Sequence, residues 1–282
     1  MAVHVARDVD DATRAVAVDE RAELIAGGTD LMVEINFGRR RPGALVAIDR
    51  VQELRGISRS GRVRVGAGVT YTQLLADDAG SAALREASRS VGSPQIRNAG
   101  TVGGNIATSS PAGDALPVLA ALEATIVVRS VRGERRVPFA EWMTGPKRNG
   151  RARDEIIVAA EWESAGPKQT FMKVGTRNAM VIAVASLALV VDASRRRVGV
   201  ALGSCGPTIL RADRAQSFAA GVLDELGWER QAAPTETACA EFGALVASAA
   251  RPIDDVRGTA AYRSHVLSVM AARALARVAV LG

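Results

Sequence analysis

The sequence predicts an α+β protein made of two parts. Its 282 residues correspond to about two domains of ordinary size. Short apolar segments that fit β-strands alternate with helical segments through most of the chain, and longer helical segments fill its C-terminal end. The turn dipeptide Gly166-Pro167 separates two strand-rich stretches. We therefore expect one part over residues 1–166 and a second over residues 167–282.

In the first part, a strand starts at Val3, and an Ala-rich helix ends at Val18. A strand over 22–26 runs into two glycines, and a helix over 30–35 follows, with Thr29 or Asp30 as its cap. The elements expected next are strands 44–48 and 62–67, helices 72–76, 81–91 and 115–122, and strands 125–131 and 155–160.

Residues 93–114 are rich in Gly, Ser, Thr, Asn and Pro and show little hydrophobic periodicity. We expect them to form one long loop, and loops of that length in compact domains are usually functional. The second part is expected to contain strands 170–174, 182–191 and 198–202, then helices 212–226, 234–250 and 259–280.

Composition excludes several classes of protein. Apolar residues make up 48% and charged residues 23%, an ordinary globular mixture. Two cysteines, Cys205 and Cys239, exclude a disulfide framework, and they exclude an iron–sulfur or Cys-rich zinc site bound by this chain alone. Two histidines, His4 and His265, are too few for a His-rich metal site, so we expect no metal. The longest apolar run, 179–191, is too short for a bilayer, and a cytoplasmic protein without membrane contact is expected.

The net charge of +6 comes from 36 Lys and Arg residues against 30 Asp and Glu residues, and only three of the cations are lysines. A basic balance of this kind raises the question of nucleic-acid binding. Aromatic residues make up only 4%, too few for base-stacking platforms, and the Arg clusters are short and far apart. We expect no nucleic-acid partner.

The first glycine-rich segment, residues 26–30 (Ala-Gly-Gly-Thr-Asp), lies between a predicted strand and a predicted helix. Paired glycines tolerate a positive φ and let a backbone approach a ligand closely. Successive amides at a helix start favour an anion such as phosphate. The segment matches neither the dinucleotide fingerprint nor the P-loop. Taken alone, it fits a structural turn as well as a phosphate site.

The second segment, residues 101–105 (Thr-Val-Gly-Gly-Asn), lies inside the expected loop. We expect its glycines to expose amides, its Thr and Asn to add polar groups, and Asp114 to accept a hydrogen bond from a ribose hydroxyl. Two such segments in one half of the chain favour a ligand with two phosphates. Neither histidine stands in a triad-like motif with a Ser or Cys nucleophile, so a bound cofactor would have to supply any difficult chemistry.

Three ordered motifs carry a specific resemblance. They are residues 26–30, residues 92–105 (Gly-Ser-Pro-Gln-Ile-Arg-Asn-Ala-Gly-Thr-Val-Gly-Gly-Asn) and residues 254–263 (Asp-Asp-Val-Arg-Gly-Thr-Ala-Ala-Tyr-Arg). With them, essentially the whole chain resembles the FAD-binding medium subunit of the molybdenum hydroxylases, the xanthine dehydrogenase and carbon monoxide dehydrogenase group. Residues 33–37, 147–149 and 173–180 look most like bacterial xanthine dehydrogenase FAD subunits.

This resemblance implies a two-lobed FAD-binding domain of the PCMH, or vanillyl-alcohol-oxidase, type, with lobes of roughly 1–55 and 56–166. A small α+β domain of the carbon monoxide dehydrogenase flavoprotein C-terminal type would follow. The implied cofactor-binding residues are Leu24, Ile25, Ala26, Gly27, Gly28, Thr29, Asp30 and Leu31 around the pyrophosphate; Thr101, Gly103, Gly104, Asn105, Ser110 and Asp114 at the phosphates and the ribityl or ribose hydroxyls; and Ile157, Lys173 and Ile182 at the flavin ring.

Lys173 would place a positive charge beside the pyrimidine ring and stabilise the anionic reduced flavin; a solvated strand lysine is the alternative. Two positions depart from the family pattern. Val91 stands where related eukaryotic enzymes have an aromatic residue, and Val181 stands where many relatives carry Asp. No protein side chain is expected to be catalytic, because the chemistry would take place at flavin N5.

By resemblance, the chain is an electron-transfer subunit of xanthine dehydrogenase. Electrons would leave the molybdopterin cofactor on a large partner subunit, pass two [2Fe-2S] clusters on a small partner subunit, and reach NAD through FAD. A dimer of heterotrimers is the expected assembly. The alternatives are the FAD subunit of another molybdenum hydroxylase, a free-standing flavin reductase, and a non-enzymatic assembly subunit whose FAD loops are degenerate.

Overall fold

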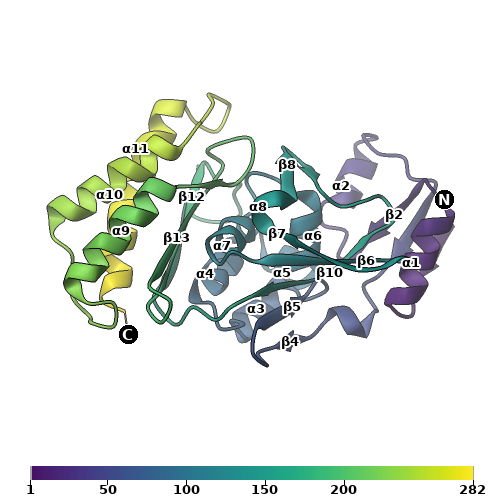
Figure 1. The fold of residues 1–282 in the computed structure, drawn as a ribbon. Helices are drawn as coiled ribbons and strands as arrows, with labels where there is room; N and C mark the ends of the chain where they lie inside the picture. The colour runs from purple at the N-terminus through teal and green to yellow at the C-terminus, as the bar shows by residue number, and fades with distance from the viewer. Residues whose placement is uncertain (1, 282) are drawn as a thin grey trace.

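The computed structural model describes residues 2–281. The chain runs from a small N-terminal lobe through a central antiparallel sheet to a layer of long helices at its C-terminal end (Figure 1). Helices and strands are both abundant, so the predicted α+β class is confirmed. None of the helices within residues 2–281 combines the length and apolar character that a membrane span requires.

The N-terminal lobe contains a three-stranded parallel sheet in the order β1 (Ala2–Val5), β3 (Ala44–Ala47), β2 (Ala22–Ile25). Helix α1 (Val9–Val18) joins β1 to β2 and starts at Asp8, whose carboxylate accepts a hydrogen bond from the Asp11 amide at 2.6 Å. Helix α2 (Leu31–Asn36) follows the first glycine-rich segment. Its cap residue is Asp30, as predicted, but the Asp30 side chain makes no capping hydrogen bond.

The central sheet is antiparallel in the order β4 (Ile57–Ser58), β5 (Val63–Gly66), β10 (Ile156–Trp162), β6 (Thr125–Ser130), β7 (Gly133–Pro138). A single turn of 3₁₀ helix, η1 (Gln52–Leu54), leads into it. Strand β10 lies in the middle and is buried along its whole length. Strand β7 is an edge strand with exposed charges, and the sequence does not predict it because its residues lack apolar alternation.

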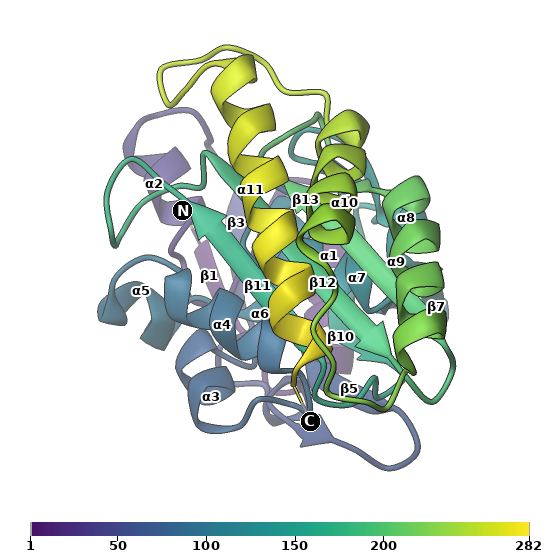
Figure 2. The ribbon, with the colours of Figure 1, turned by 90° about the vertical axis from the view of Figure 1, so that its left-hand side faces the viewer.

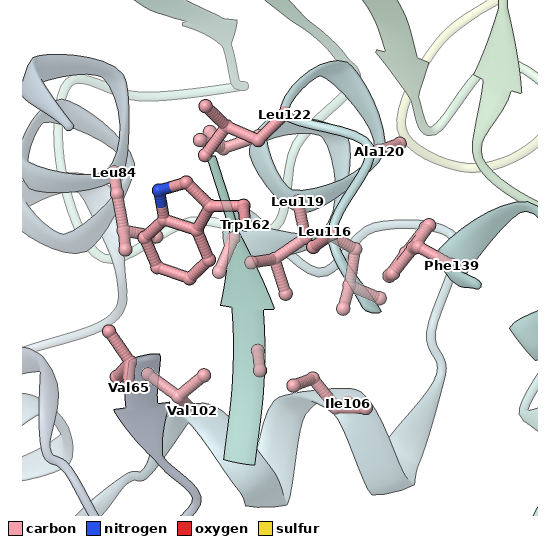
Figure 3. Packing of buried hydrophobic residues seen from close by; sticks show 14 of the residues in the cluster. Val65, Leu84, Val102, Ile106, Leu116, Leu119, Ala120, Leu122, Phe139 and Trp162 are labelled. Atoms are coloured by element: carbon pink, nitrogen blue, oxygen red, sulfur yellow. The ribbon is translucent and has the colours of Figure 1, made fainter. Parts of the chain in front are cut away.

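The five helices that follow the first two strands of this sheet are α3 (Tyr71–Ala76), α4 (Ala82–Ser90), α5 (Pro94–Ala99), α6 (Val102–Thr108) and α7 (Ala115–Ala121). The first four each begin after a Ser or Thr whose hydroxyl accepts a hydrogen bond from an amide of the first turn. These cap residues are Thr70, Ser81, Ser93 and Thr101. Figure 3 shows Trp162 of β10 packed among Leu84 of α4 and the leucines of α7, at the centre of the main core.

The prediction of one long loop over residues 93–114 is wrong, because α5 and α6 occupy most of this segment. Ser93 caps α5 with Pro94 at its first position, and Thr101 caps α6. These caps stabilise two short helices although the segment has little hydrophobic periodicity. The sequence also fails to predict α8 (Phe139–Trp142) and the small hairpin of β8 (Met143–Gly145) and β9 (Arg148–Asn149).

The C-terminal part has an antiparallel sheet in the order β11 (Gln169–Val174), β12 (Ala185–Asp192), β13 (Arg197–Gly203), β14 (Leu210–Arg211). Figure 2 shows α9 (Asp213–Leu226), α10 (Glu236–Ala249) and α11 (Ala260–Ala279) side by side over one face of this sheet. Helices α4 and α7 pack on the other face. Alternate residues of β12 therefore enter two different cores, which explains its continuous apolar run.

Strand β12 begins at Ala185 and not at Ile182 as predicted, so Ile182 lies in the preceding loop. The other predicted elements of both parts are present with ends shifted by a few residues. The boundary at Gly166-Pro167 falls between β10 and β11 and stays a prediction. Cys205 and Cys239 are buried thiols, and His265 is exposed on α11.

The C-terminal motif over residues 254–263 organises the start of α11. Arg263 is 1% exposed and donates hydrogen bonds to Asp255 at 2.6 Å and to the Ser204 carbonyl at 2.8 Å. Asp255 also accepts from the guanidinium of Arg257 at 2.6 Å. These hydrogen bonds, first among them those from Arg257, lower the pKa of Asp255 to about 2. The motif is thus explained by the local structure of the C-terminal part.

Candidate functional site

One cleft, with a volume of about 930 Å³, lies between the N-terminal lobe and the rest of the chain. Its walls come from the end of β2, the start of α2, helices α5 and α6, the β8–β9 hairpin, and β11 with the loop after it. All seventeen predicted cofactor-binding residues line this cleft. They are Leu24, Ile25, Ala26, Gly27, Gly28, Thr29, Asp30, Leu31, Thr101, Gly103, Gly104, Asn105, Ser110, Asp114, Ile157, Lys173 and Ile182.

The first glycine-rich segment presents backbone amides to the cleft. Within the described residues, the amide groups of Gly27 through Leu31 donate no hydrogen bond to the protein. Gly28 has a φ of +68°, as its glycine predicts. A Cβ at Gly27 would lie 1.7 Å from the Ala99 carbonyl oxygen, so only glycine fits there. This row of unpaired donors suits an anionic ligand.

The second segment differs from its prediction, because its amides are already occupied. Thr101 precedes α6, and its hydroxyl accepts from the Gly104 amide at 3.0 Å. The Gly103 amide donates to the Ala67 carbonyl at 2.8 Å, and a Cβ there would lie 2.5 Å from Ala67 Cβ. Gly104 has no positive φ. The glycines therefore allow α6 to pack closely on the end of β5, and they do not expose amides.

Lys173 and Asp114 form a buried ion pair in the cleft wall, 2.6 Å apart. The Lys173 side chain is 9% exposed, so the solvated-lysine alternative is wrong. Its ammonium also donates to the Ser90 carbonyl at 3.1 Å, and the Ser90 hydroxyl donates to Asp114 at 2.9 Å. Burial raises the pKa of Asp114, against the opposing effect of Lys173. Lys173 is thus not the isolated positive charge that the sequence predicts, because its carboxylate partner neutralises the pair.

Three buried polar atoms of the cleft wall have no hydrogen-bond partner within the described residues: the Tyr71 hydroxyl, Asn105 Oδ1 and Asp114 Oδ1. A buried polar atom without a partner costs free energy. A polar ligand in the cleft would supply those partners. Together with the unpaired amides of 27–31 and the lack of room for a side chain at Gly27, these atoms fit a phosphate- and hydroxyl-bearing cofactor.

Aliphatic side chains line the same cleft as the ion pair. Ile157 is 5% exposed in β10, whereas Ile182 is 60% exposed in the loop after β11. Val91 and Ile96 line the cleft near α5. Aliphatic side chains of this kind suit the faces and edges of a flat ring system.

Charged residues at the cleft wall include several that the sequence does not single out. Lys147, at the turn of the β8–β9 hairpin, bonds to Glu34 of α2 at 3.1 Å. This hydrogen bond is the main cause of a lowered pKa of Glu34. The Thr108 hydroxyl of α6 donates to Asp30 at 2.9 Å. The other basic residues of the wall are Arg21, Arg40, Arg41, Arg151 and Arg153. Their positions in the sequence show no common spacing.

Two family models match the chain. Residues 1–161 match the FAD binding domain in molybdopterin dehydrogenase. Residues 170–278 match the CO dehydrogenase flavoprotein C-terminal domain. The chain belongs to this family of FAD-binding molybdenum hydroxylase subunits, and the two-part fold implied by the resemblance is confirmed.

Relatives of several kinds are similar to the chain. It is 32% identical to the putative xanthine dehydrogenase FAD-binding subunit of Escherichia coli (strain K12), over 77% of this chain and 78% of the relative. It is 30% identical to the carbon monoxide dehydrogenase medium chain of Hydrogenophaga pseudoflava, over 90% and 88%. It is also 38% identical to the nicotinate dehydrogenase FAD-subunit of Eubacterium barkeri, over 57% of each chain.

Among solved structures, a chain of carbon monoxide dehydrogenase from Hydrogenophaga pseudoflava matches with a TM-score of 0.86 and 26% identity. The match covers 100% of this chain and 98% of that chain. Relatives with different substrates thus have comparable identities, and the similarity defines the family but not the substrate.

Proposed function

We propose that the cleft binds FAD and that the chain passes electrons from iron–sulfur clusters of a partner subunit to NAD. The observation that carries this proposal is the row of unpaired amides from Gly27 to Leu31, in the same cleft as a buried ion pair and several aliphatic side chains. The amides suit a pyrophosphate, and the aliphatic side chains suit the flavin ring. When bound, FAD supplies the chemistry that links single-electron carriers to a two-electron acceptor.

The protein's own residues have distinct roles in this proposal. Residues 24–31 wrap the pyrophosphate, and Asn105 and Asp114 present unpaired oxygens to hydroxyls of the cofactor. Ile157 and Ile182 contact the ring. Lys173 lies near the pyrimidine with its charge balanced by Asp114. Thr101 acts indirectly, because it caps the helix that carries Asn105.

We further propose xanthine as the substrate oxidised on the molybdenum subunit, with a dimer of heterotrimers as the assembly and the NAD pool of the cytoplasm as its electron acceptor. Xanthine is favoured by the resemblance to bacterial xanthine dehydrogenase FAD subunits in residues 33–37, 147–149 and 173–180. The similarity to the Escherichia coli relative favours it as well. The domain boundary at Gly166-Pro167 and the lobes of roughly 1–55 and 56–166 belong to the same proposal.

Cofactor binding is tested on the purified full chain. We expect a yellow protein, or one that takes up added FAD, and we expect acid to release the flavin intact. Within residues 2–281, the cleft is lined by no Cys or His that could form a covalent link to the flavin. A colourless chain that does not bind added FAD would contradict the proposal.

Electron transfer is tested by co-expression with the molybdenum and iron–sulfur subunits. We expect xanthine-dependent NAD reduction by the complex and none by the lone chain. Nicotinate and carbon monoxide, tested in parallel, represent the substrates of the other relatives. Turnover with one of these compounds but not with xanthine would contradict xanthine as the proposed substrate and assign that compound instead. Rapid NAD reduction by the lone chain would favour a free-standing flavoenzyme.

A further inference from the structure

Tyr71 is a buried cleft residue that neither the sequence motifs nor the family resemblance single out. It is the first residue of α3, and its side chain is 3% exposed. The residue lines the cleft, and its hydroxyl is buried without a hydrogen-bond partner within the described residues. Buried tyrosine hydroxyls usually find a partner. The lack of one points to a group that the folded chain does not itself contain.

The backbone around Tyr71 holds the ring in a fixed position between the two glycine-rich segments. Thr70 and Gln73 form a capping box at the start of α3. The Tyr71 amide donates to the Gly100 carbonyl at 3.2 Å. The Tyr71 ring and the Thr29 hydroxyl each lie 3.5 Å from the point that a Cβ on Gly100 would occupy. The hydroxyl is therefore presented by a rigid part of the wall.

Tyr71 is also close enough to Asp114 for the two groups to interact electrostatically. Burial, and after it the charge of Asp114, raises the pKa of Tyr71, so its hydroxyl remains a proton donor at all physiological pH values. Asp114 uses Oδ2 for both Lys173 and Ser90, and its Oδ1 has no partner. One wall of the cleft thus presents an unpaired donor and an unpaired acceptor.

We propose that Tyr71 is a further cofactor-binding residue, whose hydroxyl donates a hydrogen bond to a ribityl hydroxyl of FAD. An alcohol both accepts and donates a hydrogen bond, so a ribityl hydroxyl is able to accept from Tyr71, and a hydroxyl of the same ligand is able to donate to the unpaired Asp114 Oδ1. An ionised phosphate would accept from the tyrosine, but it has no proton to donate to Asp114 Oδ1. This inference rests on the proposed FAD function of the cleft.

The test compares Tyr71→Phe with Tyr262→Phe in the full chain. Tyr262 is the only other tyrosine in the sequence; it is 46% exposed and does not line the cleft. Two quantities are measured: the Kd for FAD, from quenching of flavin fluorescence, and the melting temperature without FAD. We expect Tyr71→Phe to bind FAD about tenfold more weakly, and we expect Tyr262→Phe to bind it like the wild type.

The melting temperature separates this role from a structural one. Removal of a buried hydroxyl that has no partner should leave the FAD-free chain as stable as before or more stable. FAD analogues that lack single ribityl hydroxyls then identify the contact. For one analogue, Tyr71→Phe and the wild type should bind with equal Kd, because the partner of the tyrosine is already missing.

Three results would overturn the inference while leaving the proposed function intact: an unchanged Kd for FAD in Tyr71→Phe, a fall in the melting temperature of the FAD-free variant, or an equal loss of affinity with every analogue. Failure of the wild-type chain to bind FAD would overturn the proposed function and this inference together.

Discussion

Gly28 and Gly38 have nearly the same left-handed backbone, with φ values of +68° and +69°, but only Gly28 lines the cleft. An alanine at either position adds about 1 kcal/mol of strain. We expect both Gly28→Ala and Gly38→Ala to lower stability slightly. Only Gly28→Ala should also weaken FAD binding, by about tenfold, because relief of the strain moves the amides of the segment.

Chemical denaturation and FAD titration of the two variants check this prediction. Gly38 has no atom within 4 Å of the position of an added Cβ, so its variant isolates the backbone effect. Equal affinity of the two variants for FAD would show that the conformation of Gly28 does not matter for the ligand.

The ion pair of Lys173 and Asp114 predicts an ordered series of redox potentials. At a pH high enough to keep Asp114 ionised, Lys173→Ala leaves a buried carboxylate in the cleft wall, and negative charge near the ring disfavours the anionic reduced flavin. We expect its midpoint potential to fall by roughly 20–65 mV, which corresponds to about 1–3 kcal/mol for two electrons. Asp114→Asn should raise the potential, because it leaves the cation alone.

The double variant Lys173→Ala/Asp114→Asn is the control for net charge. Its potential should lie near that of the wild type, since both carry no net charge at this position. The measurement is a redox titration of bound FAD at constant pH. A double variant that matches Lys173→Ala alone would mean that charge does not determine the potential here.

At the scale of an element, the start of α11 depends on Asp255. Asp255→Asn removes the carboxylate that accepts a hydrogen bond from Arg263. Arg263 is 1% exposed and is the most buried cation of the described residues. A cation left without its partner is costly. Because the Asp255 side chain is itself 20% exposed, water can partly compensate. We expect a loss of about 2 kcal/mol in the free energy of unfolding.

The same substitution predicts a dependence on pH. The pKa of Asp255 is lowered in the folded chain to about 2, from an ordinary value of 3.8. Its ionised form therefore stabilises the fold above pH 3.8, and this contribution is lost as the pH falls toward 2. The difference in melting temperature between the wild type and Asp255→Asn should shrink over that range. A constant difference would contradict the assignment.

Helices α5 and α6 illustrate why the sequence predicts some elements and not others. The alternation in β5 and the long helices of the C-terminal part are visible as periodic apolar residues. Helices α5 and α6 lack this pattern, and their stability comes from Ser and Thr caps and from close packing of Gly103 on Ala67. Ser93 followed by Pro94 was a local signal that could have indicated the first of them.

The site shows the same division between local and long-range information. Both glycine-rich segments are recognisable as motifs, and every predicted cofactor-binding residue lines the cleft. The pairing of Lys173 with Asp114 joins residues far apart in the chain, and so does the electrostatic effect of Asp114 on Tyr71. Such a contact leaves no local pattern in one sequence, because it forms only when β11 packs against α4 in the folded chain.

At the scale of the whole molecule, the cleft joins parts of the chain that otherwise belong to different sheets. A cofactor held by β2, α6 and β11 at once stabilises all three. At a FAD concentration a hundred times its Kd, we expect a gain of about 2.7 kcal/mol, or roughly 5–10 °C in melting temperature. Differential scanning calorimetry with and without FAD checks this prediction. A second, unshifted transition would show that one part unfolds independently of the ligand.

The contact between Lys147 and Glu34 joins the β8–β9 hairpin to α2 along the cleft, and it has a consequence for how fast a cofactor leaves. The Lys147 side chain is 56% exposed, so salt weakens its attraction to Glu34 as the Debye length falls from about 10 Å at 0.1 M to about 3 Å at 1 M. We expect FAD to leave past this contact, and that escape requires the pair to separate. Dissociation should therefore be faster at high ionic strength, and Lys147→Met should show the fast rate at every salt concentration.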